Sequence, residues 1–415
     1  MTSLKLLKRL KEIIHSEEIL QSSRLRSTAF VRNRKMNFPD ALTFMLDMRK
    51  TTLQTRLNIF FDHKGKDEPM SQQAFSKLRA NFDHTPFAAI IDAIVSDEYS
   101  GEYELPLWNG YHLLSVDGSC LQLPRTKELY QEFGTHDGKQ NQCPCAGISV
   151  LFDVLHGWSL DAIISAGAIN ERTECEKHIH FLENKLPNIA ENSIILLDRG
   201  YSSEKLFKTI EDGGSKFLAR CKSNYCIKTQ EAPMGDSIVH LNKGLKARVF
   251  KFILPSGETE TLLTNLFDCP ADDLPKLYSM RWGIETAYFR FKRELCVEKF
   301  SGKTPNSIRQ DFWASMVLLN SVAVFQREAD NAVQNRQKSK NLKNHNRART
   351  SDLIITLRDQ FIFAVLCDRP MFLDFEIERI IKTMSRVVSP VRPRRSFLRI
   401  HRPFLVANAN LKSHL

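Results

Sequence analysis

Several features that would assign a chain of 415 residues to a common class are missing from this sequence. It has no glycine-rich phosphate loop and no array of histidines and cysteines with the spacing of metal ligands. No hydrophobic run approaches the length of a membrane span. The basic amphipathic start contains Glu12, Glu17 and Glu18, whereas transit peptides are poor in acids and signal peptides need an uninterrupted apolar core. We therefore expect an intracellular protein of the cytoplasm.

Cysteines are few and irregularly placed. The chain has nine, an odd and scattered set that suits a reducing compartment better than a disulfide framework. Cys143-Pro-Cys145 is the only tight pair, and a zinc site would need a second pair nearby. We therefore assign no metal to it.

Positive charge is concentrated near the C-terminus. The chain has 59 Lys and Arg against 48 Asp and Glu, a net charge of +11. Residues 336–349 and 386–402 each hold six basic residues and no acid, so together they carry +12 and the remainder about −1. Such segments indicate binding to a polyanion.

Residues 1–105 are expected to be helical, because apolar positions recur at helical spacing. A turn-rich break, DHKGKDEP, separates two short helices, the second capped by Ser71. The pair is either a DNA-binding helix-turn-helix or a plain helical hairpin. Basic residues nearby favour DNA contact modestly: Arg24, Arg26, Arg32, Arg34 and Lys35.

From Tyr111 onward the pattern changes to strands. Three strands in succession are followed by a helix, a buried strand, another helix and a further strand. This order predicts an α/β fold with a mixed sheet of the ribonuclease-H type. In such a sheet Asp117, on the first strand, lies beside Asp198, which ends the fourth.

The predicted core is interrupted by a hairpin around Pro255-Ser256-Gly257, which we interpret as part of a β-rich insertion. We expect five regions: a helical N-terminal domain at 1–105, the first part of the core at 106–221, the insertion at 222–270, the second part of the core at 271–330, and a basic helical region at 331–415.

The stretch from Tyr278 to Lys292, YSMRWGIETAYFRFK, carries a third candidate acid. Read as one helix at about 100° per residue, it places Tyr278, Arg281, Glu285 and Lys292 within an arc of roughly 60°. An ordinary alternative is that Arg281 and Glu285 form an i,i+4 ion pair on a solvated face.

Asp117, Asp198 and Glu285 would repel one another if brought together, unless a cation intervened. Magnesium suits an all-oxygen site with open positions, and two ions about 3.5–4 Å apart can serve phosphodiester displacement. Cations on the helix of Glu285 would then contact the DNA backbone. Taken singly, Asp117 could instead be a turn residue and Asp198 a capping acid.

The spacing Tyr278-x2-Arg281-x3-Glu285-x6-Lys292 resembles the Y-R-E-K signature of the insertion-sequence-four family of bacterial DDE transposases. LLSVDGSCLQLP and LLDRGYSSEKLF resemble the family's two aspartate blocks, and the likeness covers roughly residues 105–325. The two blocks contain Asp117 and Asp198.

This resemblance implies a ribonuclease-H-like core with a β insertion before the glutamate. It also implies cleavage and strand transfer that depend on two Mg²⁺ ions, with Mn²⁺ as a possible substitute. The implied partners are double-stranded DNA, both transposon ends and target, and a second copy of the chain in a synaptic complex. By position, Asp117, Asp198 and Glu285 are implied as the catalytic metal ligands.

The same resemblance implies that Tyr278, Arg281 and Lys292 contact the DNA end. Some members of the family cut through a hairpin intermediate and stack a flipped base on a tryptophan of the insertion. Between Asp198 and Trp282 this chain has no tryptophan. Three other aromatic residues of this part are candidates: Tyr225, Phe250 and Phe252.

Two further classes of protein remain open from the sequence. One is a catalytically silent DNA-binding repressor derived from a transposase. The other is a nuclease or junction resolvase with a ribonuclease-H-like core. All three acids are present, which argues against the repressor.

Overall fold

The computed structural model describes residues 1–32, 34–135, 143–167, 170–222, 224–338, 345–367 and 369–391. The chain forms two compact units. Unit 1 consists of Met1–Ile94, Gln122–Glu132 and Arg290–Leu415, and unit 2 consists of Val95–Leu121 and Phe133–Phe289. No helix of the described residues is long and apolar enough to cross a membrane.

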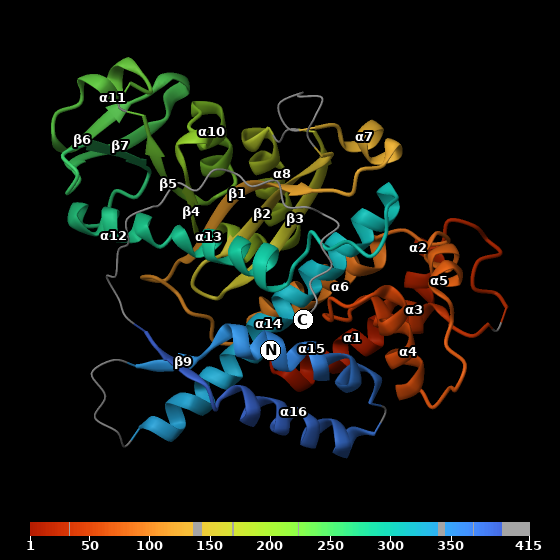
Figure 1. Ribbon diagram of the computed structural model, residues 1–415. Coiled ribbons are helices and arrows are strands. Elements are labelled where there is room, and N and C mark those ends of the chain that lie inside the picture. The colour runs from red at the N-terminus through yellow and green to blue at the C-terminus, as the bar shows by residue number, and fades with distance from the viewer. Residues whose placement is uncertain are drawn as a thin grey trace. The chain divides into compact units, whose positions relative to one another are not determined.

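Unit 2 is built on an eight-stranded mixed sheet in the order β3-β2-β1-β4-β5-β8-β7-β6 (Figure 1). Its first five strands are β1 (His112–Gln122), β2 (Cys145–Asp153), β3 (Trp158–Ala166), β4 (Ser193–Leu197) and β5 (Lys216–Cys221). β2 and β3 are antiparallel, whereas β4 is parallel to both β1 and β5. Helices α8 (Glu171–Lys185) and α10 (Glu204–Asp212) follow β3 and β4. The predicted ribonuclease-H-like sheet is therefore confirmed.

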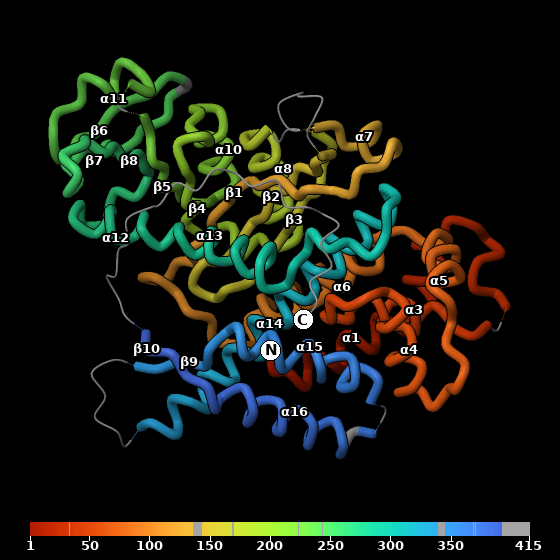
Figure 2. Tube along the Cα trace, in the orientation of Figure 1, coloured from red at the N-terminus to blue at the C-terminus, as the bar shows by residue number. Residues whose placement is uncertain are grey.

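The remaining three strands come from the predicted insertion. They are β6 (Gly235–His240), β7 (Lys246–Ile253) and β8 (Thr259–Thr264), preceded by the short helix α11 (Ile227–Glu231). β7 and β8 form the predicted hairpin, whose turn includes Gly257 at a φ of 85°. β8 pairs antiparallel with β5, so these strands continue the core sheet (Figure 2).

Local sequence signals fix the starts of several helices. The predicted N-cap Ser71 accepts a backbone hydrogen bond from Ala74 at 3.2 Å. Three further N-cap side chains do the same: Asn170 from Thr173 at 3.3 Å, Ser203 from Leu206 at 3.5 Å, and Thr304 from Ser307 at 3.3 Å. Helix termini in this chain therefore follow from side chains that can bond their own backbone.

The single helix predicted from Tyr278 to Lys292 is wrong. The structure has α12 (Leu274–Ser279), α13 (Trp282–Phe289) and a π-helical segment, η5 (Arg290–Glu294). Between α12 and α13 the backbone bonds run from residue i to i−3, with Arg281 N–H donating to the Tyr278 carbonyl at 3.1 Å. A uniform 100° per residue does not hold across such a tightened turn and a π segment.

Two cysteines of unit 2 are joined. Cys120 on β1 and Cys145 at the start of β2 form a disulfide, with their Cα atoms 6.1 Å apart. The sequence did not predict this pair, because it depends on β1 and β2 being neighbours in the sheet. The other seven cysteines are not disulfide-bonded, so there is no disulfide framework.

Unit 1 is helical. Its N-terminal helices are α1 (Ser3–Ile14), α2 (Glu17–Ser23), α3 (Phe38–Met45), α4 (Leu53–His63), α5 (Gln72–Arg79) and α6 (Thr85–Glu98, whose end belongs to unit 2). Its C-terminal helices are α14 (Pro305–Gln337), α15 (Thr350–Leu366) and α16 (Pro370–Met384). α1 lies against all three C-terminal helices, so the two ends of the described chain share one helical body.

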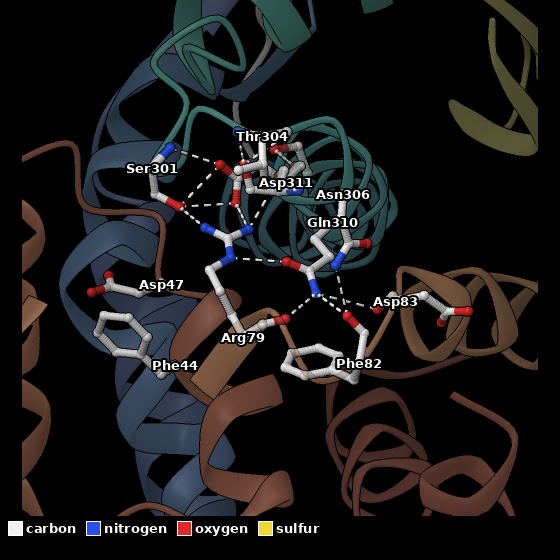
Figure 3. A network of polar contacts seen from close by, with 12 residues as sticks. Phe44, Asp47, Arg79, Phe82, Asp83, Ser301, Thr304, Asn306, Gln310 and Asp311 are labelled. Carbon is white, nitrogen blue, oxygen red and sulfur yellow. Dashed lines mark hydrogen bonds and ion pairs between the residues drawn. The ribbon is translucent and has the colours of Figure 1, made fainter. Parts of the chain in front are cut away.

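A buried arginine fastens α5 to α14 (Figure 3). Arg79 is 3% exposed and donates to Gln310 Oε1 at 2.8 Å, Ser301 Oγ at 2.7 Å and Asp311 Oδ1 at 2.8 Å. Burying a guanidinium is tolerable only with such complete pairing. The network therefore holds together segments more than 200 residues apart in the chain.

We expect Arg79→Ala to lower the free energy of unfolding by about 3–5 kcal/mol, because it leaves the carboxylate of Asp311 without its buried counter-ion. Arg379→Ala is a matched control, since Arg379 pairs with Glu376 on the exposed face of α16. Its loss should be below about 1 kcal/mol. Denaturant titration measures both, and equal losses would contradict the importance of the buried network.

Candidate active site

The pairing of β1 with β4 brings the first two predicted acids to the same edge of the sheet. Ser115 on β1 lies opposite Leu196 on β4, the last residue pair of this parallel ladder. Extended by two residues along each strand, the same register would bring Asp117 level with Asp198. Asp198 directly follows β4, and the carboxyl ends of parallel strands are where α/β sheets bind ligands.

Asp117 and Asp198 also make the local hydrogen bonds expected of a turn residue and of a capping acid. Asp117 accepts from the Gly118 N–H at 2.9 Å, and Asp198 accepts from the Arg199 N–H at 2.7 Å. These bonds orient one oxygen of each carboxylate. They are compatible with a shared role, because each carboxylate keeps a second oxygen.

The third acid, Glu285, comes from α13 and is bonded to its own helix. Arg281 Nη2 donates to Glu285 Oε1 at 2.8 Å, and Arg281 is only 5% exposed. The Tyr278 hydroxyl lies 3.5 Å from Asp198 Oδ1, and the Arg281 guanidinium lies 5.9 Å from the centre of the Tyr278 ring. The pair Arg281–Glu285 is thus the predicted i,i+4 ion pair, but it is largely buried rather than solvated.

The electrostatics of unit 2 couple the three acids. The pKa of Asp117 is raised to about 6, chiefly by burial. Arg281 and the Gly118 N–H oppose this rise, and the charges of Glu285 and Asp198 add to it. Arg281 is buried as well, which disfavours its charge, yet its pKa is raised because Tyr278 and the acids surround it. Arg281 is therefore the counter-ion of the acidic cluster.

The chemistry of these donors fits a hard divalent cation. The charges of Asp198 and Glu285 both act on Asp117, whose pKa is raised. A positive charge stabilises such a set of carboxylates. Among the described residues, however, no three His, Cys, Asp or Glu side chains are close enough together to hold a metal ion. Glu285 is instead bonded to Arg281.

Lys292 lies half-buried in η5, which belongs to unit 1, whereas the three acids, Tyr278 and Arg281 belong to unit 2. Within unit 2, hydrogen bonds join Arg281 to Glu285 and Tyr278 to Asp198.

The sequence interpretation missed Tyr288, which ties the helix of Glu285 to the strand of Asp117. The Tyr288 hydroxyl donates to the Asp117 carbonyl oxygen at 2.7 Å, across 171 residues of chain. Tyr288 follows Glu285 by three residues, so it lies on nearly the same side of α13. That spacing was a visible signal.

It also missed Glu171, at the start of α8. A Cβ added to Gly200 would lie 2.1 Å from Glu171 Oε2, so this carboxylate lies against the loop that follows Asp198. Burial, and then the charge of Asp198, raises the pKa of Glu171. No motif in the sequence marks this fourth acid.

The aromatic residues considered for base stacking already pack against other aromatic rings. Phe250 is buried and stacks on Phe252 with ring centroids 5.5 Å apart. Tyr225 is half-buried and meets Phe207 edge-on at 6.2 Å. Phe250 is therefore unsuited to stack on a DNA base without rearrangement.

A ribonuclease-H-like sheet with one aspartate on its first strand, a second directly after the neighbouring parallel strand and a glutamate on a following helix defines a class of enzymes that cut nucleic acids. Residues 108–321, more than half of the chain, match the family model described as "Transposase DDE domain". The chain belongs to this family of DDE transposases. Proteins of the family generally use divalent metal ions.

Curated relatives are distant. Transposase InsG for insertion sequence element IS4 of Escherichia coli (strain K12) is 23% identical over 239 residues, which are 52% of this chain and 52% of InsG. Putative transposase InsZ of the same organism is 24% identical over 208 residues, 49% of this chain and 67% of InsZ. The match thus spans about half the length of InsG.

Among solved structures, a cryo-EM structure of the piggyBac transposase synaptic complex with hairpin DNA is similar with a TM-score of 0.48. The identity is 14%, and the match covers 91% of this chain and 85% of that chain. This likeness is too weak to support a conclusion.

We expect Tyr288→Phe to destabilise the protein by about 1 kcal/mol, because it removes a buried hydrogen bond to the backbone of Asp117. Cleavage of DNA should slow by at least a similar factor, about fivefold, since the Asp117 peptide is then less well held. Denaturant titration and single-turnover cleavage measure the two effects.

Tyr201→Phe is the matched control. Tyr201 is 1% exposed and follows Asp198 closely, but its buried hydroxyl has no hydrogen-bond partner among the described residues. Removing that hydroxyl should leave stability unchanged or slightly raised. If the two variants behave alike, the bond from Tyr288 does not position Asp117.

Proposed function

We propose that this chain is the transposase of an insertion sequence. It binds the terminal inverted repeats of the element and catalyses Mg²⁺-dependent strand cleavage and strand transfer, in cut-and-paste transposition. The observation that carries this proposal is the β1–β4 register, which would bring Asp117 level with Asp198 if extended by two residues, while the charge of Glu285 acts on Asp117.

Asp117, Asp198 and Glu285 would hold the metal ions, two Mg²⁺ with Mn²⁺ as a substitute. Bound there, the ions supply activation of the attacking oxygen and stabilisation of the leaving oxygen. The chain's own residues prepare the site. Burial raises the pKa of Asp117, and the positive charge of a bound metal ion would favour its ionised form. Before a metal ion binds, Arg281 is the counter-ion of Glu285.

DNA contact at the site is assigned to Tyr278, Arg281 and Lys292. The Y-R-E-K spacing supports this assignment. The burial of Arg281 limits the ways in which its guanidinium could contact DNA. Since Arg281 is bonded to Glu285, contact with a DNA phosphate requires it to share or exchange that partner.

The basic segments 336–349 and 386–402 are assigned to sequence-independent phosphate contact. Residues 339–344 and 392–402 of these segments lie outside the described part of the chain. Double-stranded DNA, both element ends and target, and a second copy of the chain in a synaptic complex are the proposed partners.

Replacing Asp117, Asp198 or Glu285 by Ala should each abolish cleavage of a terminal-repeat duplex while DNA binding persists, because transition-state charge stabilisation is lost. Glu183→Ala, on the solvent side of α8, is the control for loss of a negative charge in unit 2. Cleavage with Mg²⁺ and after chelation is followed on gels, and binding by mobility shift.

A single-acid variant that cleaves near the wild-type rate would remove that residue from the site. A wild-type protein that binds the ends but never cleaves them would favour the silent repressor. A protein that cleaves any duplex equally would favour the nuclease.

Arg281→Lys should impair cleavage severely, because a planar fork that bridges Glu285 and a phosphate cannot be replaced by a point charge. Lys292→Arg should be mild, since any cation suffices for backbone contact. Single-turnover cleavage on a preformed protein–DNA complex isolates the chemical step from binding. If Arg281→Lys cleaves like the wild type, the ion pair with Glu285 serves stability alone.

A further inference from the structure

Unit 1 contains a group of cations with too few counter-charges. It begins at Asp47, whose side chain is 1% exposed and is shared by two arginines. Arg49 Nε lies 2.9 Å from Asp47 Oδ1, and Arg56 Nε lies 3.2 Å from Oδ2. Arg56 is further satisfied by backbone carbonyls, including that of Phe44 at 3.4 Å. One buried carboxylate therefore serves two guanidinium groups.

Lys50 adds a further charge that this carboxylate does not pair with. Among the residues that the structure describes, Lys50 forms no hydrogen bond or ion pair. Burial, and then repulsion by Arg56, lowers its pKa to about 8, and Arg358 on α15 acts in the same direction. Asp311 attracts it, but that carboxylate is already bound by Arg79.

Two arginine N–H groups of the same group of cations are also unused. Arg49 Nη2 and Arg358 Nε are buried and find no hydrogen-bond acceptor in the described part of the chain. Arg358 Nη2 donates to the Glu294 carbonyl, which fixes the direction of its fork. Arg49 is held by Asp47 on one side, and its guanidinium lies 5.4 Å from the ring centre of Phe363. Both donors are thus preoriented.

Uncompensated cations of this kind are costly in a folded protein, because burial removes their hydration without supplying an acceptor. Lys50, Arg49 and Arg358 are each half-buried, so a ligand at the surface can approach the exposed parts of these side chains. Arg49 Nη2 and Arg358 Nε are themselves inaccessible to solvent, so a ligand reaches these two donors only after a local rearrangement. What they lack is an anion with several acceptor oxygens. A phosphate group meets that need, since it accepts from guanidinium forks and from an ammonium together.

We propose that Lys50, Arg49 and Arg358 form a binding site in unit 1 for a backbone phosphate of bound DNA. The choice of DNA over a free anion rests on the proposed function. The site would give the helical unit a fixed phosphate contact, in addition to those assigned to the basic segments.

The test is Lys50→Met, which keeps the length of the side chain and removes its charge. We expect two changes of opposite sign. Affinity for duplex DNA should fall several-fold, and the slope of log affinity against log salt should become shallower by about 0.9, as for one lost phosphate contact. The unliganded protein should melt at a higher temperature, because an uncompensated buried charge is gone.

Lys77→Met is the matched control, because Lys77 is exposed on α5 of the same unit. It should leave the melting temperature unchanged and weaken binding less than Lys50→Met. Lys50→Arg should restore much of the DNA affinity, since it restores the charge. Fluorescence anisotropy at several salt concentrations and thermal unfolding provide the measurements.

Inorganic phosphate separates the two sources of the anion. It should raise the melting temperature of the wild type more than that of Lys50→Met. If phosphate does so but Lys50→Met binds DNA like the wild type, the site takes a free anion and the proposal is overturned. If neither measurement responds to Lys50, the cluster is structural and the proposal is again overturned. The loss of cleavage expected when Asp117, Asp198 or Glu285 is replaced by Ala does not depend on either result. The phosphate site and the proposed function can therefore fail separately.

Discussion

The parallel pairing of β1 with β4 is the constraint on which the candidate active site depends. A shift of one residue in this register would turn the side chain of Asp117 to the other face of the sheet relative to Asp198. The register is held by burial, because all five residues of β4 are buried and so are the paired residues of β1. Core packing, rather than any contact between the acids, thus aligns two carboxylates that repel each other.

The sequence predicted those parts of the fold that depend on neighbours along the chain. The N-cap Ser71 accepts a hydrogen bond from the backbone three residues ahead, and a strand such as β4 is visible as an apolar run. Asp117 could be assigned to β1 and Asp198 to the position after β4 because each lies at a change of pattern, and the order of the strands followed from the apolar runs.

Other features depend on partners far away in the chain, and the sequence could not supply them. The split of the Tyr278–Lys292 stretch arises from backbone bonding that a uniform periodicity does not represent. The burial of Arg281 changes the meaning of its bond to Glu285, since the same i,i+4 spacing describes an exposed pair equally well. Tyr288 was visible on the helix, but its acceptor is a carbonyl on β1.

The pairing of β8 with β5 has a consequence for how the core sheet is protected. Without β6, β7 and β8, strand β5 would be an exposed edge directly beside β4, the strand that Asp198 follows. Open edges invite pairing with other chains, and proteins normally cover them. The inserted strands move that edge outward to β6, whose burial alternates residue by residue along the strand. They therefore guard the sheet against aggregation, whatever contact they make with DNA, and they could not be deleted without exposing it.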